Sequence, residues 1–297
     1  MAAKNEIVGD YRLYHLIRAG AVYEIWAVRR VSGSDAFAMK WLPKDSSKYS
    51  SQAVKELKHE FTVGKALDHP SCITTYDYGS GSNGAWLLME FFKTPNLKQQ
   101  ITANVKALQW RVKDVLTNAA AGLAHMHERG WVHRDIKPDN YLINEENDVR
   151  LIDFTIAAKR SSGLGKLLGG KVKVQGTYSY MSPEQIRGQG VDPRDDVYSF
   201  GCLAYELLAG KLPFTANSPQ ELLQRHLKSR PPSLTVIDKN IHPDFANYVA
   251  QMLAKTREER PQSMKEVMVQ IKSQPVFYTQ PDKPKPEEEQ PADAAED

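Results

Sequence analysis

The sequence is organised around one polar loop, residues 133–140, which lies between two apolar segments. The loop reads His-Arg-Asp-Ile-Lys-Pro-Asp-Asn and is followed by an apolar Tyr-Leu-Ile run that is expected to form a short buried strand. Pro138 prevents the loop from continuing as a helix. We therefore expect Asp135, Lys137 and Asn140 to point into one small volume. There a carboxylate can accept a proton, an ammonium can hold a migrating anion, and an amide oxygen can bind a divalent metal.

Composition is typical of a soluble globular protein. The chain has 297 residues, of which 41% are hydrophobic and 25% are charged, so it can bury one large core or two small ones. No apolar run reaches the ~18 residues that a membrane span needs, and the first ten residues lack an apolar signal region. Cys72 and Cys202 are far apart and fit reduced core thiols. These features predict a cytoplasmic protein without a membrane span.

Charge divides the chain into a basic body and an acidic tail. Residues 275–297 contain seven acidic residues, two lysines and five prolines, a net charge of −5, so the remainder carries +8 of the total of +3. A segment of this composition cannot bury enough apolar surface to order itself, so we predict a disordered tail. The basic body favours anionic ligands. It has no basic stripe interleaved with aromatic residues, so nucleic acid is not an expected partner.

The polar loop matches the pattern H-R-D-x-K-x-x-N and resembles the catalytic loop of the protein kinases. The resemblance implies that Asp135 orients and deprotonates an acceptor hydroxyl. Lys137 would stabilise the transferred charge, and Asn140 would bind Mg²⁺. The alternative, a polar turn without function, does not account for the further matches on either side of the loop.

Upstream of the loop, a strand expected at residues 36–42 contains one lysine, Lys40, and resembles the V-A-I-K pattern of kinases. The resemblance implies that Lys40 contacts the α- and β-phosphates of ATP and that Ala38 lies on the adenine. Glu60, in a helix expected between residues 50 and 67, takes the place of the helix-C glutamate that pairs with this lysine. Gly64 lies one turn further on, where its lack of a side chain is expected to reduce the packing of this helix and so to make the helix mobile.

The segment that would cover the phosphates departs from the family pattern. Residues 18–25 keep only the middle glycine of G-x-G-x-x-G-x-V, Gly20, while Arg18 and Tyr23 replace the other two. The missing glycines limit how closely the backbone can approach phosphate, and restoring glycine at position 23 is expected to tighten ATP binding. Residues 88–92 resemble the kinase hinge, and in this hinge-like segment Met89 takes the gatekeeper place. The resemblance implies a nucleotide site lined by Ile17, Gly20, Ile25, Ala38, Lys40, Met89, the Glu90 carbonyl, the Phe92 amide and Leu142.

Downstream, Asp153 opens an Asp-Phe-Thr triplet where kinases have Asp-Phe-Gly, which implies a second Mg²⁺ ligand. Thr155 replaces the glycine and restricts the backbone. Thr177, after Gly176, resembles the threonine that contacts the catalytic aspartate in serine/threonine kinases. Two further pairings are implied, between Arg260 and Glu184 and between the Asp196 carboxylate and the backbone of the catalytic loop.

The loop before Thr177 is expected to be exposed and mobile, and it has no hydroxyl residue between positions 167 and 173. Ser161 and Ser162 are the nearest upstream hydroxyls, while Lys171 and Lys173 add positive charge. We therefore expect that loop autophosphorylation is not the main switch. An anionic partner, an acidic substrate or the acidic tail, the weakest of the three candidates, is expected to order this loop instead.

Together these features identify an α+β, bilobal kinase fold that is most similar to bacterial eukaryotic-like (Hanks-type) serine/threonine kinases. We expect an N-terminal extension (1–9), a kinase domain (10–274) and the acidic tail (275–297). The small lobe (10–91) would hold a five-stranded antiparallel sheet with helix C, and the large lobe (92–274) would be mainly helical. The expected reaction is transfer of the ATP γ-phosphoryl group, with Mg²⁺, to Ser or Thr hydroxyls of proteins. A nucleotide-binding pseudokinase scaffold and a small-molecule phosphotransferase are the alternatives.

Overall fold

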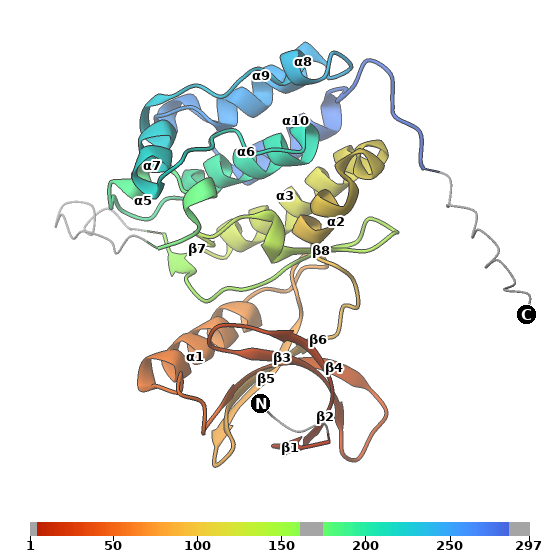
Figure 1. Ribbon diagram of the computed structural model, residues 1–297, viewed down its shortest axis with the longest axis vertical. Helices are drawn as coiled ribbons and strands as arrows, with labels where there is room; N and C mark the ends of the chain where they lie inside the picture. Colours follow the sequence, from red (N-terminus) through yellow and green to blue (C-terminus); the bar gives the residue numbers. More distant parts are fainter. Residues whose placement is uncertain (1–4, 161–174, 285–297) are drawn as a thin grey trace, which may run out of the picture.

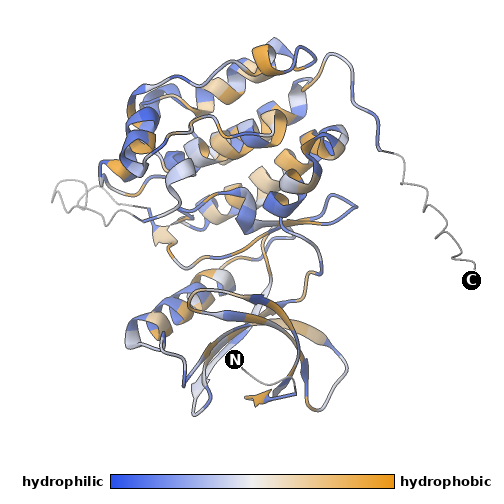
Figure 2. Cartoon of the chain, viewed as in Figure 1, coloured by the Kyte–Doolittle hydropathy of each residue, from blue (hydrophilic) through white to orange (hydrophobic). Residues whose placement is uncertain are grey.

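The computed structural model describes residues 5–160 and 175–284, which form two lobes (Figure 1). The small lobe, at the bottom of Figure 1, combines a curled antiparallel sheet with one helix, and the large lobe is mainly helical. Figure 2 shows apolar residues on the small-lobe strands and on the large-lobe helices, interspersed with polar residues along each element. This architecture confirms the predicted α+β, bilobal fold.

The small-lobe sheet contains six strands in the order β1-β2-β3-β4-β6-β5. The strands are β1 (Ile7–Val8), β2 (Tyr11–Ala19), β3 (Glu24–Arg30), β4 (Ala36–Pro43), β5 (Thr75–Gly81) and β6 (Gly84–Glu90). The sequence predicted five of them. The sixth, β1, pairs with the start of β2 and comes from the predicted N-terminal extension. It joins the sheet because Val8, only 1% exposed, packs into the same apolar cluster as Tyr11 and Trp26.

Strand β4 presents opposite faces to two different environments. Met39 and Trp41 enter the apolar cluster inside the curled sheet, together with Leu13. Side chains alternate along a strand, so Ala38 and Lys40 face the other way. A single lysine is thereby placed on the sheet face that turns toward the large lobe.

Helix α1 (Ser51–Lys65) packs on the sheet and begins with a side-chain cap, because the Ser50 hydroxyl accepts a hydrogen bond from the Ala53 amide at 3.1 Å. Its buried face includes Glu60 and Gly64. A Cβ atom on Gly64 would lie 2.2 Å from the Thr75 hydroxyl oxygen. The expectation that Gly64 leaves less packing is therefore wrong, because this glycine allows close contact between α1 and β5.

The large lobe is built on two buried helices, α3 (Val112–Glu128) and α6 (Pro193–Ala209). Helix α3 packs against α6 and α10, and α6 also packs against α9. In the described part of the chain, the remaining helices are α2 (Leu97–Asn104), α5 (Pro183–Ile186), α7 (Pro219–Lys228), α8 (Leu234–Ile237), α9 (Pro243–Met252) and α10 (Met264–Ser273). Short 3₁₀ turns occupy Val105–Arg111, Pro138–Asn140, Tyr178–Tyr180 and Arg257–Glu259.

Two small ladders frame the polar loop. The loop follows β7 (Trp131–Val132), which pairs with β10 (Ala158–Lys159), and it precedes β8 (Tyr141–Ile143), which pairs with β9 (Val149–Leu151). The Ile152 amide donates a hydrogen bond to the Asn140 carbonyl at 3.0 Å. The polar loop and the segment after β9 therefore lie side by side.

The large lobe extends beyond the predicted boundary at residue 274. Val276 and Phe277 are buried, and Phe277 forms a β-bridge with Ile241. The His242 amide donates to the Val276 carbonyl at 2.9 Å. The predicted tail thus begins too early, because two large apolar residues after Pro275 find a place in the core. Residues 285–297 lie outside the described part of the chain.

Among the helices in residues 5–160 and 175–284, none has the length and apolar character needed to cross a membrane.

Candidate active site

The backbone of the polar loop is held by one buried carboxylate from α6. Asp196 accepts hydrogen bonds from the amides of His133 and Arg134, each at 2.8 Å, and from His127 Nε2 at 2.8 Å. Burial by itself would raise the pKa of Asp196, but the bonds and charges from His127 and the loop outweigh it and lower the pKa. The predicted bond between Asp196 and the loop is present. It stabilises Arg134 in a left-handed conformation with φ 71°.

Asp135 lies at the centre of a hydrogen-bonded cluster that contains the other polar residues predicted around it. Its Oδ1 accepts from both the amide and the hydroxyl of Thr177, each at 2.9 Å. Its Oδ2 accepts from Lys137 Nζ at 2.6 Å and from Asn140 Nδ2 at 3.3 Å. Lys137 also donates to the Thr177 hydroxyl at 2.8 Å. The structure thus brings together four predicted residues from two separate segments.

Gly176 allows Thr177 to approach the loop. Its φ of +121° is a conformation that residues with a side chain rarely adopt, and an added Cβ atom would lie 3.0 Å from the Arg134 carbonyl oxygen. That same carbonyl oxygen accepts a hydrogen bond from Gln185 Nε2 at 2.8 Å. The chain after Gly176 is therefore fastened to the catalytic loop at two neighbouring points.

A second cluster surrounds Lys40, which is 8% exposed. Its Nζ lies 2.7 Å from Glu60 Oε2, 3.2 Å from Asp153 Oδ1 and 3.2 Å from the Thr155 hydroxyl oxygen. The predicted pairing of Lys40 with Glu60 is present, and Asp153 joins it from the large lobe. The three N–H groups of this ammonium thus have three oxygen acceptors.

The charges of this second cluster support each other. Burial by itself would lower the pKa of Lys40, but Asp153 and Glu60 outweigh it and leave the pKa raised. The Asp153 side chain is only partly removed from water, which by itself would raise its pKa, but Lys40 and the Thr155 hydroxyl outweigh this and hold the pKa well below its usual range. We therefore describe Lys40 as an ammonium and Asp153 as a carboxylate at neutral pH.

Thr155 makes polar contacts that were not predicted from the sequence. Its hydroxyl lies 2.6 Å from Asp153 Oδ1 and 3.0 Å from Glu60 Oε2, in addition to its contact with Lys40. The sequence pattern had indicated only a restriction on the backbone at this residue. The sequence did contain one signal for these contacts, because Thr155 carries a hydroxyl two positions after Asp153, a proposed metal ligand.

The side chains of Asn140 and Asp153 can supply oxygen ligands to a magnesium ion. Asn140 Nδ2 donates to the Asp135 carbonyl at 2.8 Å, which leaves its Oδ1 as an acceptor. The two side-chain contacts that the structure describes for Asp153 use Oδ1. Within residues 5–160 and 175–284, no group of three or more His, Cys, Asp or Glu side chains could hold a metal ion. A pair of protein oxygens fits Mg²⁺, which is commonly bound by one or two carboxylates, waters and substrate phosphates.

The predicted adenine-side residues come from neighbouring strands and one large-lobe ladder. Ile25 pairs with Lys40 and Ala38 pairs with Met89, so these side chains share the sheet face that carries Lys40. Gly20 lies in the β2–β3 turn, where its amide donates to the Tyr23 carbonyl at 2.9 Å. Ile17 lies at a register shift in β2, and Leu142 belongs to β8 of the large lobe. Their roles toward a nucleotide remain predictions.

The hinge-like segment is braced by a side-chain contact. Glu90 forms an ion pair with Arg150 on β9, with Oε1 and Oε2 at 3.0 and 2.9 Å from Arg150 Nε. The same guanidinium lies 4.6 Å from the centre of the Phe92 ring. The sequence predicts only backbone roles for Glu90 and Phe92, and these roles remain predictions.

Tyr23 occupies a position where the family pattern has glycine, and its side chain turns inward. Its ring centre lies 4.9 Å from Lys40 Nζ, and its hydroxyl donates to the Ala53 carbonyl in α1 at 2.9 Å. Burial raises the pKa of this hydroxyl to about 12. Tyr23 therefore links the β2–β3 turn to both the lysine and the helix that positions it.

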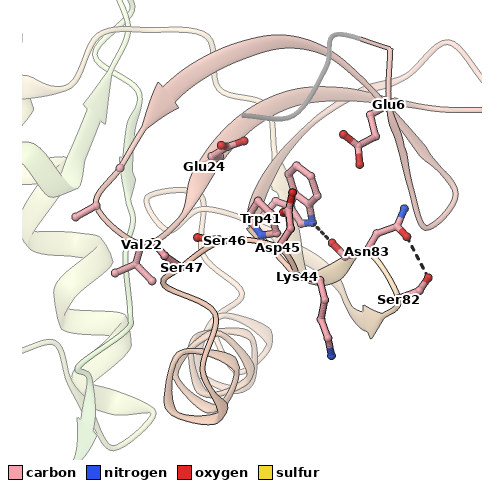
Figure 3. Close-up of a pocket in the computed structure, with 13 residues that line it drawn as sticks. Glu6, Val22, Glu24, Trp41, Lys44, Asp45, Ser46, Ser47, Ser82 and Asn83 are labelled. Carbon is pink, nitrogen blue, oxygen red and sulfur yellow. Dashed lines mark hydrogen bonds between the residues drawn. The ribbon is translucent and has the colours of Figure 1, made fainter.

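A separate pocket of about 640 Å³ opens on the other side of the β2–β3 turn (Figure 3). It is lined by residues of that turn, including Gly20 and Val22, and by Trp41, whose indole donates to the Asn83 carbonyl at 3.0 Å. Because Trp41 faces away from Lys40, this pocket does not belong to the cluster described above.

Four residues invoked for loop control, Ser161, Ser162, Lys171 and Lys173, lie outside the described residues. The predicted pairing of Arg260 with Glu184 is present, with Arg260 Nη2 at 2.8 and 3.0 Å from the two carboxylate oxygens.

Comparison with known proteins gives the same family as the site geometry. Residues 11–277 match the protein kinase domain family. The chain is 30% identical over 275 residues to the serine/threonine-protein kinase PknB of Mycobacterium tuberculosis, covering 91% of this chain and 44% of that protein. It is 27% identical over 273 residues to PrkC of Bacillus subtilis, covering 92% of this chain and 42% of that protein. It is 32% identical over 278 residues to pkn2 of Myxococcus xanthus, covering 90% of this chain and 33% of that protein. The chain therefore spans less than half the length of these relatives.

Proposed function

The chain belongs to the protein kinase domain family, and from this membership we propose that it is an ATP-dependent serine/threonine kinase. The acceptors would be Ser or Thr hydroxyls of proteins, and Mg²⁺ would accompany the nucleotide. The observation that carries the proposal is the Asp135 cluster, in which one carboxylate contacts Lys137, Thr177 and Asn140 at once. The names of the relatives, all serine/threonine kinases, support the same substrate class.

Asp135 is the proposed base for the acceptor hydroxyl. Its two oxygens accept hydrogen bonds from an amide, a hydroxyl and an ammonium, and these bonds orient the carboxylate. A positioned base of this kind contributes roughly 10²–10⁴-fold to a reaction rate. Lys137 keeps a positive charge 2.6 Å from Asp135, where it can stabilise negative charge on the transferred group.

Lys40 is the proposed ligand of the nucleotide phosphates, in exchange for one of its three described contacts, and Glu60 holds it in place at 2.7 Å. Asn140 Oδ1 and Asp153 Oδ2 would hold Mg²⁺, which when bound neutralises charge on the phosphates. The apolar side chains of Ala38 and Met89, on the same sheet face as Lys40, would cover the adenine. Catalysis then consists mainly of placement and electrostatic stabilisation.

The test of this function is Asp135→Asn, assayed by phosphate transfer from labelled ATP to a generic basic protein. We expect transfer to fall by roughly 10²–10⁴-fold, while nucleotide binding stays nearly unchanged because Asp135 faces the hydroxyl and not ATP. The matched control is Asp139→Asn, the same change in the same loop, which should keep wild-type transfer. Transfer by Asp135→Asn close to that of the control would contradict the assignment.

The same assay separates a kinase from a nucleotide-binding scaffold. A wild-type protein that binds Mg-ATP but transfers phosphate to neither itself nor the basic substrate would behave as a pseudokinase. The reduced glycine pattern around Gly20 is the feature that this outcome would implicate.

The two cysteines support a reducing compartment, and we propose the cytoplasm. Cys72 and Cys202 are buried and free. Burial raises the pKa of the Cys72 thiol to about 12 and also raises that of Cys202. Both thiols should therefore stay protonated and unreactive.

The anionic or acidic partner expected at the loop before Thr177 rests on Lys171 and Lys173, outside the described residues, and it remains a prediction.

A further inference from the structure

The Thr155 hydroxyl occupies a position in which it touches every charged member of the Lys40 cluster. Its Oγ1 lies 2.6 Å from Asp153 Oδ1, 3.0 Å from Glu60 Oε2 and 3.2 Å from Lys40 Nζ. These partners come from α1, β4 and the segment after β9. The position corresponds to glycine in the family pattern, so this set of contacts needs a side chain that the pattern lacks.

The direction of these bonds follows from the inventory of donors and acceptors. A hydroxyl has one proton to donate and two lone pairs that accept. The Lys40 ammonium can only donate, so Thr155 accepts from it and gives its own proton to a carboxylate. Asp153 is the nearer carboxylate, at 2.6 Å against 3.0 Å for Glu60. The Thr155 hydroxyl thus accepts a hydrogen bond from Lys40 and donates one to Oδ1 of Asp153.

The local backbone turns both polar side chains to the same side. Phe154, between them, is 1% exposed and packs edge-on against the His133 ring at 5.8 Å. With Phe154 anchored in the core, Asp153 and Thr155 both face Lys40. Thr155 is also stiff at its first side-chain torsion because it is β-branched, so its hydroxyl is a well-defined donor.

We propose that Thr155 is a positioning residue for the magnesium ligand: its hydroxyl fixes Oδ1 of Asp153 and so keeps Oδ2 directed to the metal. Within residues 5–160 and 175–284, Oδ2 accepts no hydrogen bond. The Asp153 side chain is 40% exposed, so packing alone does not fix its orientation. The inference rests on the proposed function in one respect, the use of Asp153 as a metal ligand.

The size of the effect follows from what such supporting contacts do elsewhere. Loss of a group that orients a metal ligand typically costs about 10–100-fold in metal affinity or activity. Without the hydroxyl, Lys40 remains as the only described partner of Oδ1, at 3.2 Å. The carboxylate then gains rotational freedom, and binding of the metal–nucleotide complex has to restrict it again.

The experiment compares Thr155→Val, which keeps the shape and removes the hydroxyl, with Thr155→Ser, which keeps the hydroxyl. Calorimetry measures ATP affinity in EDTA and at a series of Mg²⁺ concentrations, and kcat and KM for Mg-ATP are measured separately. The matched control is Thr62→Val, the same change on the exposed side of α1, where the hydroxyl bonds to the Lys58 carbonyl at 2.9 Å. Thermal unfolding of each variant reports whether it is folded, and Thr155→Ala is a second hydroxyl-free variant.

We expect Thr155→Val and Thr155→Ala to lose about tenfold or more of the gain in ATP affinity that Mg²⁺ provides, with metal-free affinity nearly unchanged. Thr155→Ser should recover most of that gain, and Thr62→Val should match the wild type. A Mg²⁺ dependence in Thr155→Val equal to that of wild type would overturn the inference. So would a serine variant no better than valine.

These readouts distinguish the inference from the proposed function. Metal-dependent nucleotide binding is measured without any phosphate transfer. A wild type that binds Mg-ATP and transfers nothing would overturn the function alone, and the comparison of valine with serine would still decide the role of Thr155. A wild type whose ATP affinity does not respond to Mg²⁺ would overturn the inference directly.

Discussion

The buried ion pair between Arg260 and Glu184 gives a quantitative test of how the large lobe supports the active site. Both carboxylate oxygens of Glu184 accept from Arg260 Nη2, and the side chains of Glu184 and Arg260 are 4% and 0% exposed, respectively. The same guanidinium donates to the carbonyls of Ala254 at 2.9 Å and Arg194 at 3.0 Å. Glu184 lies in α5, shortly after the segment that carries Thr177 to Asp135. The ion pair thus connects the segment after Thr177 to the chain between α9 and α10.

Glu184→Gln removes one charge and leaves the buried guanidinium without the carboxylate to which it is bonded. Breaking a buried pair in this way typically costs about 3–5 kcal/mol in the free energy of unfolding. In a domain of this size each 1 kcal/mol shifts Tm by roughly 2–4 °C, so we expect a fall of about 6–20 °C. The loss should depend little on salt, because a pair excluded from water is screened much less than a surface pair.

The measurement is thermal and urea unfolding of Glu184→Gln beside Glu221→Gln. Glu221 pairs with Arg225 at 2.7 Å on α7, but its side chain is 44% exposed, so this control should unfold close to wild type. Phosphate transfer should fall only in Glu184→Gln, in proportion to the loosening of the segment that holds Thr177. Equal stability of the two variants would refute the reasoning that burial sets the cost.

Three other changes test particular contacts. Tyr23→Gly should weaken ATP binding rather than tighten it, because it removes both the ring beside Lys40 and the hydrogen bond to α1. The matched control is Tyr23→Phe, which keeps the ring. Tighter ATP binding by the glycine variant would restore the expectation drawn from the family pattern. Gly64→Ala should destabilise the protein by about 1–3 kcal/mol and raise the KM for ATP, because its Cβ atom would lie 2.2 Å from the Thr75 hydroxyl oxygen. Adding Thr75→Ala should recover part of the lost stability. A single variant as stable as wild type would show that α1 can shift without cost. Burial lowers the pKa of His226 to about 4, against an ordinary value of 6.5. The contribution of the neutral imidazole to folding is therefore fully present above pH 6.5 and is lost as pH falls toward 4, so urea unfolding should show about 3 kcal/mol less stability at pH 4 from this group. The same dependence of unfolding free energy on pH in His226→Gln would exclude His226 as the cause.

Local sequence determined the parts of the site that lie within single motifs. The polar loop places Asp135, Lys137 and Asn140 within six residues, and the proline and the following strand restrict the backbone that carries them. Their grouping could therefore be predicted from the local sequence alone. Lys40 and Asp153 were instead identified by their resemblance to the V-A-I-K and Asp-Phe-Gly patterns of kinases. The bilobal fold was implied by the resemblance to kinases, which the order and spacing of these motifs supported.

Tertiary structure decided the contacts that join residues distant in sequence. Thr155 and Glu60 are 95 residues apart, and Tyr23 and Ala53 are 30 apart. A sequence pattern records which side chains are available, but it does not record which of them meet, because that depends on how helices and strands pack. The same reason explains Gly64, whose role is visible only when β5 lies against α1. It also explains Val276 and Phe277: composition placed them in a disordered tail, while the large-lobe core had apolar surface for them to cover.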